Sequence, residues 1–194
     1  MFVDLLRAKL SGICEISDQQ AATMQAHYEL LLRWNRVLSL TTVTDVESAV
    51  ERHYCESVFA AIHLPVGAWS VADLGSGAGF PGLPIAIIRP ECTVTLIESH
   101  QRKAAFLKEA ARAMRSVRVI ARRAEDVRER FDWLVSRAVR VDQVAGPIKS
   151  LAGSVELLTG EVDVAGLSGI EWDPPIPIPW GNRGYLRIGR FDTK

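Results

Sequence analysis

Apolar side chains recur at three- and four-residue spacing through the first third of the chain, a pattern typical of amphipathic helices. Residues 18–38 predict one such helix, which Ser17 or Asp18 can cap at its N-terminus. Residues 45–64 predict a second helix, with Asp45 as its cap. We therefore interpret residues 1–66 as an N-terminal helical subdomain.

From Trp69 onward the pattern changes to short apolar runs, several of them rich in β-branched residues, which alternate with helical segments. The predicted strands are residues 70–74, 93–98, 117–121, 131–136 and 154–158, and the predicted helices are residues 83–88, 101–115, 125–130 and 141–151. This alternation predicts an α/β fold, with helices on both faces of a doubly wound, mostly parallel sheet. Residues 67–194 would form this second domain.

A proline-rich segment, residues 172–180, interrupts the alternation. Proline has no N–H to donate to a neighbouring strand, so this segment cannot be a central strand. Residues 185–191 alternate apolar and polar side chains, and we expect them to form an edge strand reached through a hairpin.

The composition is that of a globular protein of 194 residues, 48% of them apolar and 24% charged. Three scattered cysteines make neither a disulfide framework nor a zinc site, so we expect no metal. No apolar run has the length of a membrane helix, and we expect a cytoplasmic protein with no membrane partner. The net charge is zero, but residues 101–140 carry 12 basic and 5 acidic side chains. This basic block is either a solvated helix face or a surface for a polyanion.

A glycine-rich loop, DLGSGAGFPG (73–82), lies between a predicted strand and a predicted helix. Residues 77–82 match the GxGxxG of dinucleotide sites, whereas residues 73–79 match the acidic-GxGxG pattern typical of S-adenosylmethionine (SAM) methyltransferases. Asp73 suits an ammonium group better than a pyrophosphate, and Phe80 begins an apolar stretch with few N–H groups for phosphate. The local chemistry therefore favours SAM over NAD.

Glu98 ends the next predicted strand, 25 residues after Asp73. An acidic side chain at that place accepts hydrogen bonds from ribose hydroxyls in dinucleotide and SAM sites alike. It supports an adenosine-type ligand without separating the two. An NAD-dependent oxidoreductase also needs an acid or base at the hydride site, and the sequence offers no obvious one.

Further motifs accompany the glycine loop, namely LRWNRVLSLT (32–41), RH (52–53), ES (56–57), KAAFLK (103–108) and SRA (136–138). With these motifs the chain resembles the RsmG (GidB) family of bacterial methyltransferases over nearly its whole length. The resemblance implies a Rossmann-like SAM-dependent methyltransferase fold with an N-terminal helical extension. It also implies an enzyme that methylates N7 of a guanosine in small-subunit (16S) ribosomal RNA.

By position, the resemblance implies a SAM site made by Gly75, Gly77, Gly79, Phe80, Glu98, Ala124, Glu125 and Arg137. Glu98 would take the ribose, and Ala124 and Glu125 would flank the adenine. Arg137 would face the site near the methyl group, which makes it the candidate catalytic residue. The candidate substrate-binding residues are Asn35, His53, Arg102 and Lys103.

Other roles for some of these side chains stay open. Arg137 either contacts the substrate phosphate or base edge, or forms a structural ion pair. A lone histidine on a helix face, such as His53, is more often a satisfied structural residue than a catalyst. We expect Asn35 to tie its helix to the following loop through its amide. Methylation of guanine N7 needs no general base, because this atom carries a lone pair and no proton.

The chain departs from the family pattern at three positions. Ser39 replaces an asparagine, Glu56 replaces an aspartate, and Thr159 stands where a lysine is expected. These departures keep open the alternative of a non-catalytic or altered-substrate SAM-binding paralogue. The expected partner is 16S rRNA or the small ribosomal subunit, and the expected oligomeric state is a monomer.

Overall fold

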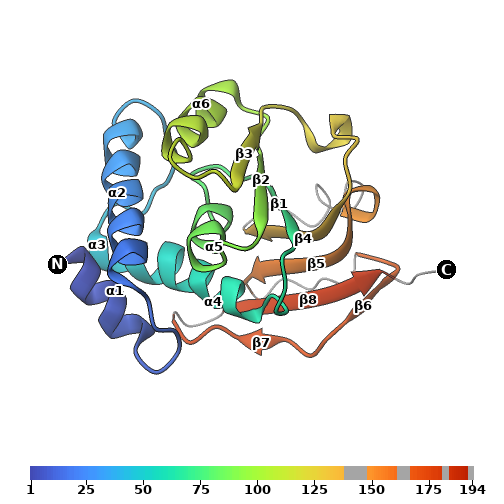
Figure 1. The fold of residues 1–194 in the computed structure, drawn as a ribbon, viewed down its shortest axis with the longest axis horizontal. Helices are drawn as coiled ribbons and strands as arrows, with labels where there is room; N and C mark the ends of the chain where they lie inside the picture. Colours follow the sequence, from blue (N-terminus) through green and yellow to red (C-terminus); the bar gives the residue numbers. More distant parts are fainter. Residues whose placement is uncertain (138–147, 161–166, 181–183, 192–194) are drawn as a thin grey trace.

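The computed structural model describes residues 1–137, 148–160, 167–180 and 184–191 (Figure 1). Its centre is an eight-stranded sheet in the order β3-β2-β1-β4-β5-β8-β6, with β7 paired to β8. The strands are β1 (Ser70–Leu74), β2 (Thr93–Ile97), β3 (Val117–Ile120), β4 (Phe131–Arg137), β5 (Ala152–Thr159), β6 (Ile170–Trp172), β7 (Ile176–Pro177) and β8 (Tyr185–Phe191). Strands β1 to β5 run parallel, and β8 runs antiparallel to β5. The predicted mostly parallel α/β sheet is confirmed.

Strand β8 lies inside the sheet, so the predicted edge position of residues 185–191 is wrong. Its outer side pairs with the short strands β6 and β7. Alternation in a sequence marks the two faces of a strand, and edge and interior antiparallel strands share that alternation. The proline-rich segment stays outside the centre of the sheet as predicted, because Pro177 belongs to the two-residue strand β7.

The helices are α1 (Phe2–Leu10), α2 (Asp18–Asn35), α3 (Val46–Ala49), the π-helical turn η1 (Val50–Cys55), α4 (Glu56–His63), α5 (Gly82–Ile88), α6 (Gln101–Ala110) and the 3₁₀ turn η2 (Ala124–Asp126). Ser17 and Asp45 cap α2 and α3 as predicted, by accepting hydrogen bonds from the backbone N–H groups of Gln20 and Ser48. Among the described residues, no helix has both the length and the apolar character needed to cross a bilayer.

Some predicted helices differ from those observed. Helix α2 ends at Asn35 and α6 at Ala110, earlier than the periodicity suggested. The predicted helix 125–130 is only the turn η2, because Val127 is the one apolar residue that this charged segment can bury. The predicted helix 45–64 is a continuous helical run that widens at η1. Of the predicted helix 141–151, residues 148–151 are helical and the rest lie outside the described residues.

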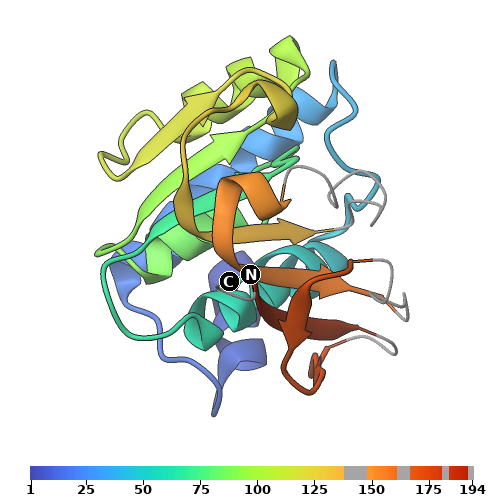
Figure 2. The ribbon, with the colours of Figure 1, turned by 90° about the vertical axis from the view of Figure 1, so that its right-hand side faces the viewer.

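The N-terminal helices share the larger of two apolar cores with one face of the sheet. Leu6 of α1, Leu31 of α2 and Val58 of α4 belong to the same buried cluster as Trp133 and Val135 of β4. The other face of the sheet carries a smaller core. Figure 2 shows the twist of the sheet from β3 at the top to β8 at the bottom. The proline-rich segment also meets α1, because the indole N–H of Trp180 donates to the Lys9 carbonyl over 3.2 Å.

The strand order places a crevice where the two halves of the sheet diverge. From β1 the chain continues to β2 and β3 on one side, and later to β4 and β5 on the other. In open α/β sheets, ligands bind outside the carboxyl ends of the strands at such a point. We therefore expect a ligand site at the segment that follows β1 and at the end of β4.

Candidate functional site

The glycine turn follows β1 directly and closes against the neighbouring strand. The N–H groups of Gly75 and Ser76 both donate to the Ile97 carbonyl of β2, over 2.9 and 3.2 Å. Gly75 and Gly77 have φ values of 71° and 53°, in the left-handed region that residues with a Cβ rarely occupy. The chain can therefore reverse here while it presents bare backbone on its open side.

Asp73 supports this turn from below. Its side chain is buried, and one carboxylate oxygen accepts a hydrogen bond from Gly82 N over 3.0 Å. Among the described residues the other carboxylate oxygen has no partner, and burial raises the pKa of Asp73 to about 7. The sequence suggested that Asp73 would face an ammonium group. In the structure its carboxylate is buried on the inner side of the turn, where it accepts the N–H of Gly82.

Glu98 connects the turn to the segment after β2. One carboxylate oxygen accepts from Gly77 N over 3.0 Å, and the other accepts from His100 N over 2.7 Å. The side chain is buried. Glu98 therefore fixes the tip of the turn, and each oxygen keeps a lone pair for a further donor.

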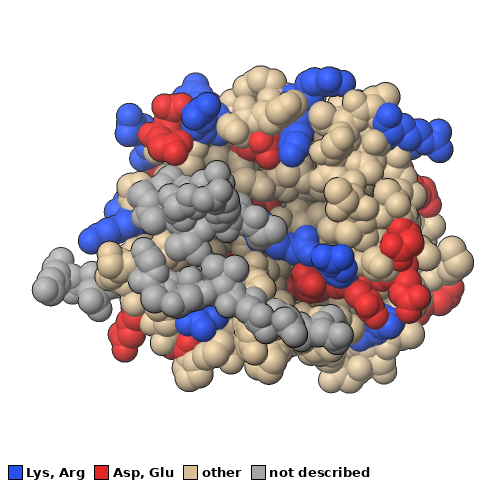
Figure 3. Space-filling model, turned by 180° about the vertical axis from the view of Figure 1, so that it is seen from behind, with Lys and Arg blue, Asp and Glu red and all other residues tan. Residues whose placement is uncertain are grey.

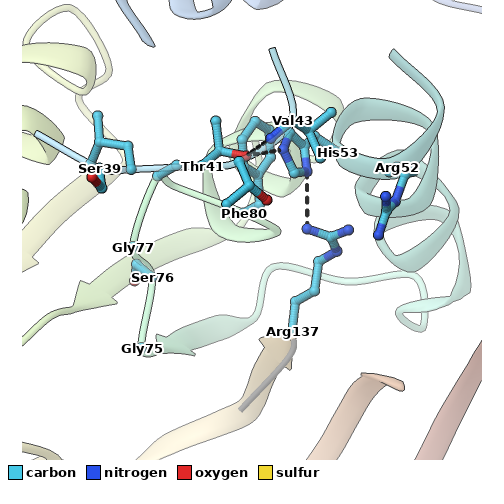
Figure 4. Close-up of a pocket in the computed structure, with 13 residues that line it drawn as sticks. Ser39, Thr41, Val43, Arg52, His53, Gly75, Ser76, Gly77, Phe80 and Arg137 are labelled. Atoms are coloured by element: carbon cyan, nitrogen blue, oxygen red, sulfur yellow. Dashed lines mark hydrogen bonds between the residues drawn. The ribbon is translucent and has the colours of Figure 1, made fainter. Parts of the chain in front are cut away.

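A pocket of about 420 Å³ opens beside the turn, at the carboxyl ends of β1 and β4 (Figure 4). It is lined by Ser39, Leu40, Thr41, Thr42, Val43, Arg52, His53, Gly75, Ser76, Gly77, Ala78, Phe80 and Arg137. Three segments far apart in sequence thus meet here: the loop 39–43, the turn η1, and the strand ends. The volume lies in the range of small-molecule sites.

His53 occupies the centre of the pocket wall. Its Nδ1 lies 3.0 Å from Nη1 of Arg137, and its Nε2 lies 2.8 Å from Oγ1 of Thr41. The ring stacks on Phe80 with centroids 4.7 Å apart. Burial, and then the nearby Arg137 charge, lower the pKa of His53 to about 3, so the ring is neutral at pH 7. His53 is both a satisfied structural residue and part of the pocket.

Arg137 is held by an ion pair with Glu56. Its Nε and Nη2 both lie 3.0 Å from one carboxylate oxygen of Glu56, and only 18% and 16% of the two side chains are exposed. Burial raises the pKa of Glu56, and the Arg137 charge opposes that rise. The ion pair foreseen as one alternative is present, and the arginine also lines the pocket. The substitution at Glu56 keeps the charge that Arg137 needs.

Asn35 shapes the loop that forms the outer wall. Its amide nitrogen donates to the Thr41 carbonyl over 2.9 Å, and its amide oxygen accepts from the N–H groups of Leu40 and Thr41. The predicted tie between helix and loop is confirmed. Asn35 itself does not line the pocket, so it acts on the site through the position of Thr41.

Besides Asn35, six predicted site residues do not line the pocket, namely Gly79, Glu98, Arg102, Lys103, Ala124 and Glu125. Ala124 and Glu125 form the turn η2 after β3, and Arg102 and Lys103 begin α6. The Arg102 guanidinium donates to the Val37 carbonyl over 3.3 Å, at the start of the loop that leads to the pocket. The adenine and substrate roles of the residues in η2 and α6 stay predictions.

Basic side chains gather on the edge of the molecule that includes α6. The exposed members between residues 101 and 130 are Arg102, Lys108, Arg112, Arg115, Arg118, Arg122, Arg123, Arg128 and Arg130. In Figure 3, Lys and Arg side chains line the upper edge of the molecule and lie beside a central hollow. The position of this basic surface suits a long polyanion that reaches the pocket.

His27 is a supporting residue that the sequence did not single out. Its buried ring contacts the turn, with Nε2 3.0 Å from the Ala78 carbonyl, and Tyr54 Oη lies 2.9 Å from Nδ1. A carbonyl only accepts, so Nε2 carries the proton and Tyr54 donates to Nδ1. Burial lowers the pKa of His27 to about 4.

A His27→Gln variant should reveal this buried neutral histidine through the pH dependence of stability. The folded pKa of about 4 lies below the unfolded value of 6.5, so His27 contributes stability above pH 6.5 that is lost as the pH falls towards 4. Between pH 7.5 and 5, the wild type should lose about 2 kcal/mol relative to the variant. Urea unfolding at both pH values measures this, with the surface variant His100→Gln as control. A pH-independent difference for His27→Gln would contradict the assignment.

Residues 20–154 match the family model GidB, rRNA small subunit methyltransferase G. Proteins of that name from Staphylococcus carnosus and Roseiflexus sp. are 37% and 43% identical over 134 and 131 residues. These matches cover 64% and 63% of the chain and 56% of each relative, so the chain spans little more than half of their length.

Solved structures with the same fold share little sequence identity with the chain. A SAM-dependent methyltransferase from Aquifex aeolicus is 14% identical, with a TM-score of 0.61 over 74% of this chain and 93% of that one. Fibrillarin from Methanococcus jannaschii is 17% identical, with a TM-score of 0.57 over 71% and 75% of the two chains. At such low identity these likenesses show the Rossmann-like methyltransferase fold alone.

Proposed function

Because the chain belongs to the GidB family, rRNA small subunit methyltransferase G, we propose that it methylates N7 of a guanosine in 16S rRNA with SAM as methyl donor. The observation that carries the proposal is the position of the pocket within the family match. Every residue that lines the pocket falls within residues 20–154. The loop 39–43, the turn η1 and Arg137 are therefore parts of the family's own architecture.

The residues present fit SAM. The turn 75–78 lines the pocket mainly with backbone, since Gly77 has no side chain and the Ser76 hydroxyl points down to the Asp73 carbonyl over 2.9 Å. Among the described residues, a Cβ at Gly77 would meet no neighbour closer than 3.7 Å, so this glycine leaves space where a ligand can approach. Glu98 offers carboxylate lone pairs for ribose hydroxyls, and Phe80 offers an apolar surface.

SAM, when bound, supplies an electrophilic methyl carbon. The chain contributes orientation, because guanine N7 attacks with its own lone pair and no proton has to be removed. His53 is neutral and Arg137 is neutralised by Glu56, so the pocket adds little net positive charge next to a base that becomes cationic on methylation. Arg52 lies at the exposed edge of the pocket, where it can hold a phosphate of the RNA.

The proposed partner is 16S rRNA, free or within the small ribosomal subunit, and the proposed state of the enzyme is a monomer in the cytoplasm. The basic surface near α6 supports an RNA partner, because phosphate contacts by Arg and Lys supply most of the sequence-independent binding energy. Binding through these side chains should weaken steeply as salt concentration rises.

The proposal predicts that SAM binds and that Glu98→Ala weakens this binding at least about tenfold, because one hydrogen-bonding partner and the support of Gly77 are lost together. Calorimetry with SAM, S-adenosylhomocysteine and NAD measures the binding. Glu129→Gln, at an exposed ion pair with Arg118, is the matched control and should bind as the wild type does.

Methyl transfer is tested with labelled SAM on small subunits and naked 16S rRNA from cells that lack this protein, followed by mapping of 7-methylguanosine. The expected result is one labelled guanosine that is unmethylated in those cells. SAM binding with no transfer to either substrate would favour the non-catalytic paralogue. Binding of NAD in preference to SAM would refute the cofactor assignment.

A further inference from the structure

The hydrogen bonds around His53 have only one consistent direction. A guanidinium donates and never accepts, so Arg137 must donate to Nδ1 of His53. The neutral ring then carries its single proton on Nε2 and donates it to Oγ1 of Thr41. The Glu56 carboxylate holds Arg137 in place, which prevents the ring from adopting the other tautomer without loss of a hydrogen bond.

With the hydrogen bonds in this direction, the Thr41 hydroxyl can form one further hydrogen bond, in which its O–H is the donor. Its oxygen accepts from Nε2 of His53 over 2.8 Å and from Val43 N over 3.0 Å, which uses both lone pairs. Within the described ranges no carbonyl or carboxylate accepts the hydroxyl proton. Thr41 lines the pocket, and Figure 4 shows its oxygen among the side chains of that wall. The O–H is therefore available to an acceptor in the pocket.

We propose that the Thr41 hydroxyl donates a hydrogen bond to O6 of the target guanine and so selects guanine over adenine. This inference rests on the proposed function and identifies its specificity-determining group. Guanine presents two neighbouring acceptors on one edge, N7 and O6, whereas adenine presents N7 beside an amino donor. A base whose N7 faces the methyl donor therefore brings O6 or N6 to the same wall of the pocket.

The fixed donor role of the Thr41 hydroxyl is what gives selectivity. Thr41 can only donate, because its lone pairs are occupied, and the guanidinium groups of Arg52 and Arg137 also only donate, whereas the hydroxyls of Ser39 and Thr42 on the same loop can accept as well. An adenine amino group placed against Thr41 would meet a donor instead of an acceptor, which leaves both hydrogen-bonding groups unpaired. A hydroxyl free to rotate between donor and acceptor roles would not discriminate in this way.

The test compares two bases and two enzymes. The substrates are RNAs that carry either guanosine at the mapped target position or 2-aminopurine riboside, which keeps N7 and the 2-amino group but lacks O6. We expect the ratio of kcat/KM for guanosine to kcat/KM for 2-aminopurine to fall about tenfold in Thr41→Val relative to the wild type. The intrinsic difference in N7 reactivity cancels, because it enters both ratios. Thr41→Ser keeps the hydroxyl and should keep the wild-type ratio.

Thr44→Val is the matched control, since Thr44 is exposed and outside the pocket, and its ratio should equal that of the wild type. If Thr41→Val proves unstable, Thr41→Ala serves the same comparison. An unchanged ratio in the variant overturns the inference, and an unchanged ratio together with a tenfold loss of SAM affinity would place the hydroxyl on the cofactor instead. Failure of the wild type to methylate either RNA would reject the proposed function itself, a distinct outcome.

Discussion

An Arg137→Met variant is expected to lose about 3 kcal/mol of unfolding free energy and at least about a hundredfold in rRNA methylation. The stability is lost because Glu56, only 16% exposed, would keep a buried carboxylate without its cation. Activity is lost because Nδ1 of His53 would have no donor, so the ring could change tautomer and release Thr41. Urea unfolding at pH 7.5 and a labelled-methyl assay on small subunits measure the two effects.

Two comparisons isolate the ion pair. Arg7→Met removes the partner of Asp18 at an exposed site and should change stability by no more than about 0.5 kcal/mol. The double variant Arg137→Met/Glu56→Leu should recover most of the lost stability but no activity, because an apolar pair can replace a buried ion pair in packing alone. Equal unfolding free energies for Arg137→Met and Arg7→Met would show that the buried pair of Arg137 and Glu56 does not stabilise the fold.

Gly82→Ala should destabilise the protein by about 3 kcal/mol and abolish SAM binding. A Cβ at this position would lie 2.4 Å from a Leu96 methyl carbon, 2.6 Å from the Asp73 carboxylate and 2.8 Å from the Asp73 Cβ. Relief of these contacts must move Asp73 or the start of α5, and either shift breaks the hydrogen bond between Gly82 N and Asp73. The glycine turn above would lose its support.

Gly153→Ala is the control for this substitution, because no atom of the part of the chain that the structure describes lies within 4 Å of the added Cβ in β5. It should be neutral or slightly stabilising, since alanine restricts the unfolded chain. Thermal unfolding and SAM calorimetry on the two variants separate the outcomes. A Gly82→Ala protein as stable as Gly153→Ala would mean that the packing around Asp73 yields more easily than the contacts suggest.

The elements that the sequence predicted well are those that local chemistry determines. The strand 70–74 has the predicted bounds, and its glycine turn follows where the spacing of glycines indicated. Asn35 was expected to bind the next loop, and its amide does so with three hydrogen bonds. The partners of Asn35 lie five and six residues away, and the strand and its turn show in their own apolar run and glycine spacing, so the local pattern carries the information.

Features that depend on distant partners could not be found in this way. Residues 185–191 alternate as predicted, but their interior position follows from pairing with β6 and β7. The sequence around Thr41 does not show that its hydroxyl contacts His53 of η1, which in turn contacts Arg137 of β4. These contacts exist only in the folded chain. His27 looks like one more position on an amphipathic stripe, and only the fold brings it under Ala78. The resemblance supplied Arg137 but not the side chains that orient it.

The interior position of β8 affects how the chain folds during its synthesis. During synthesis β5 has an unpaired side until residues 185–191 leave the ribosome, because β8 supplies its antiparallel neighbour. The indole N–H of Trp180 likewise donates to the Lys9 carbonyl, so this contact of α1 forms only after residue 180 has been made. The nascent chain therefore carries an open β5 edge only while residues 160–191 are made, and such an edge can pair with the wrong strand during that interval.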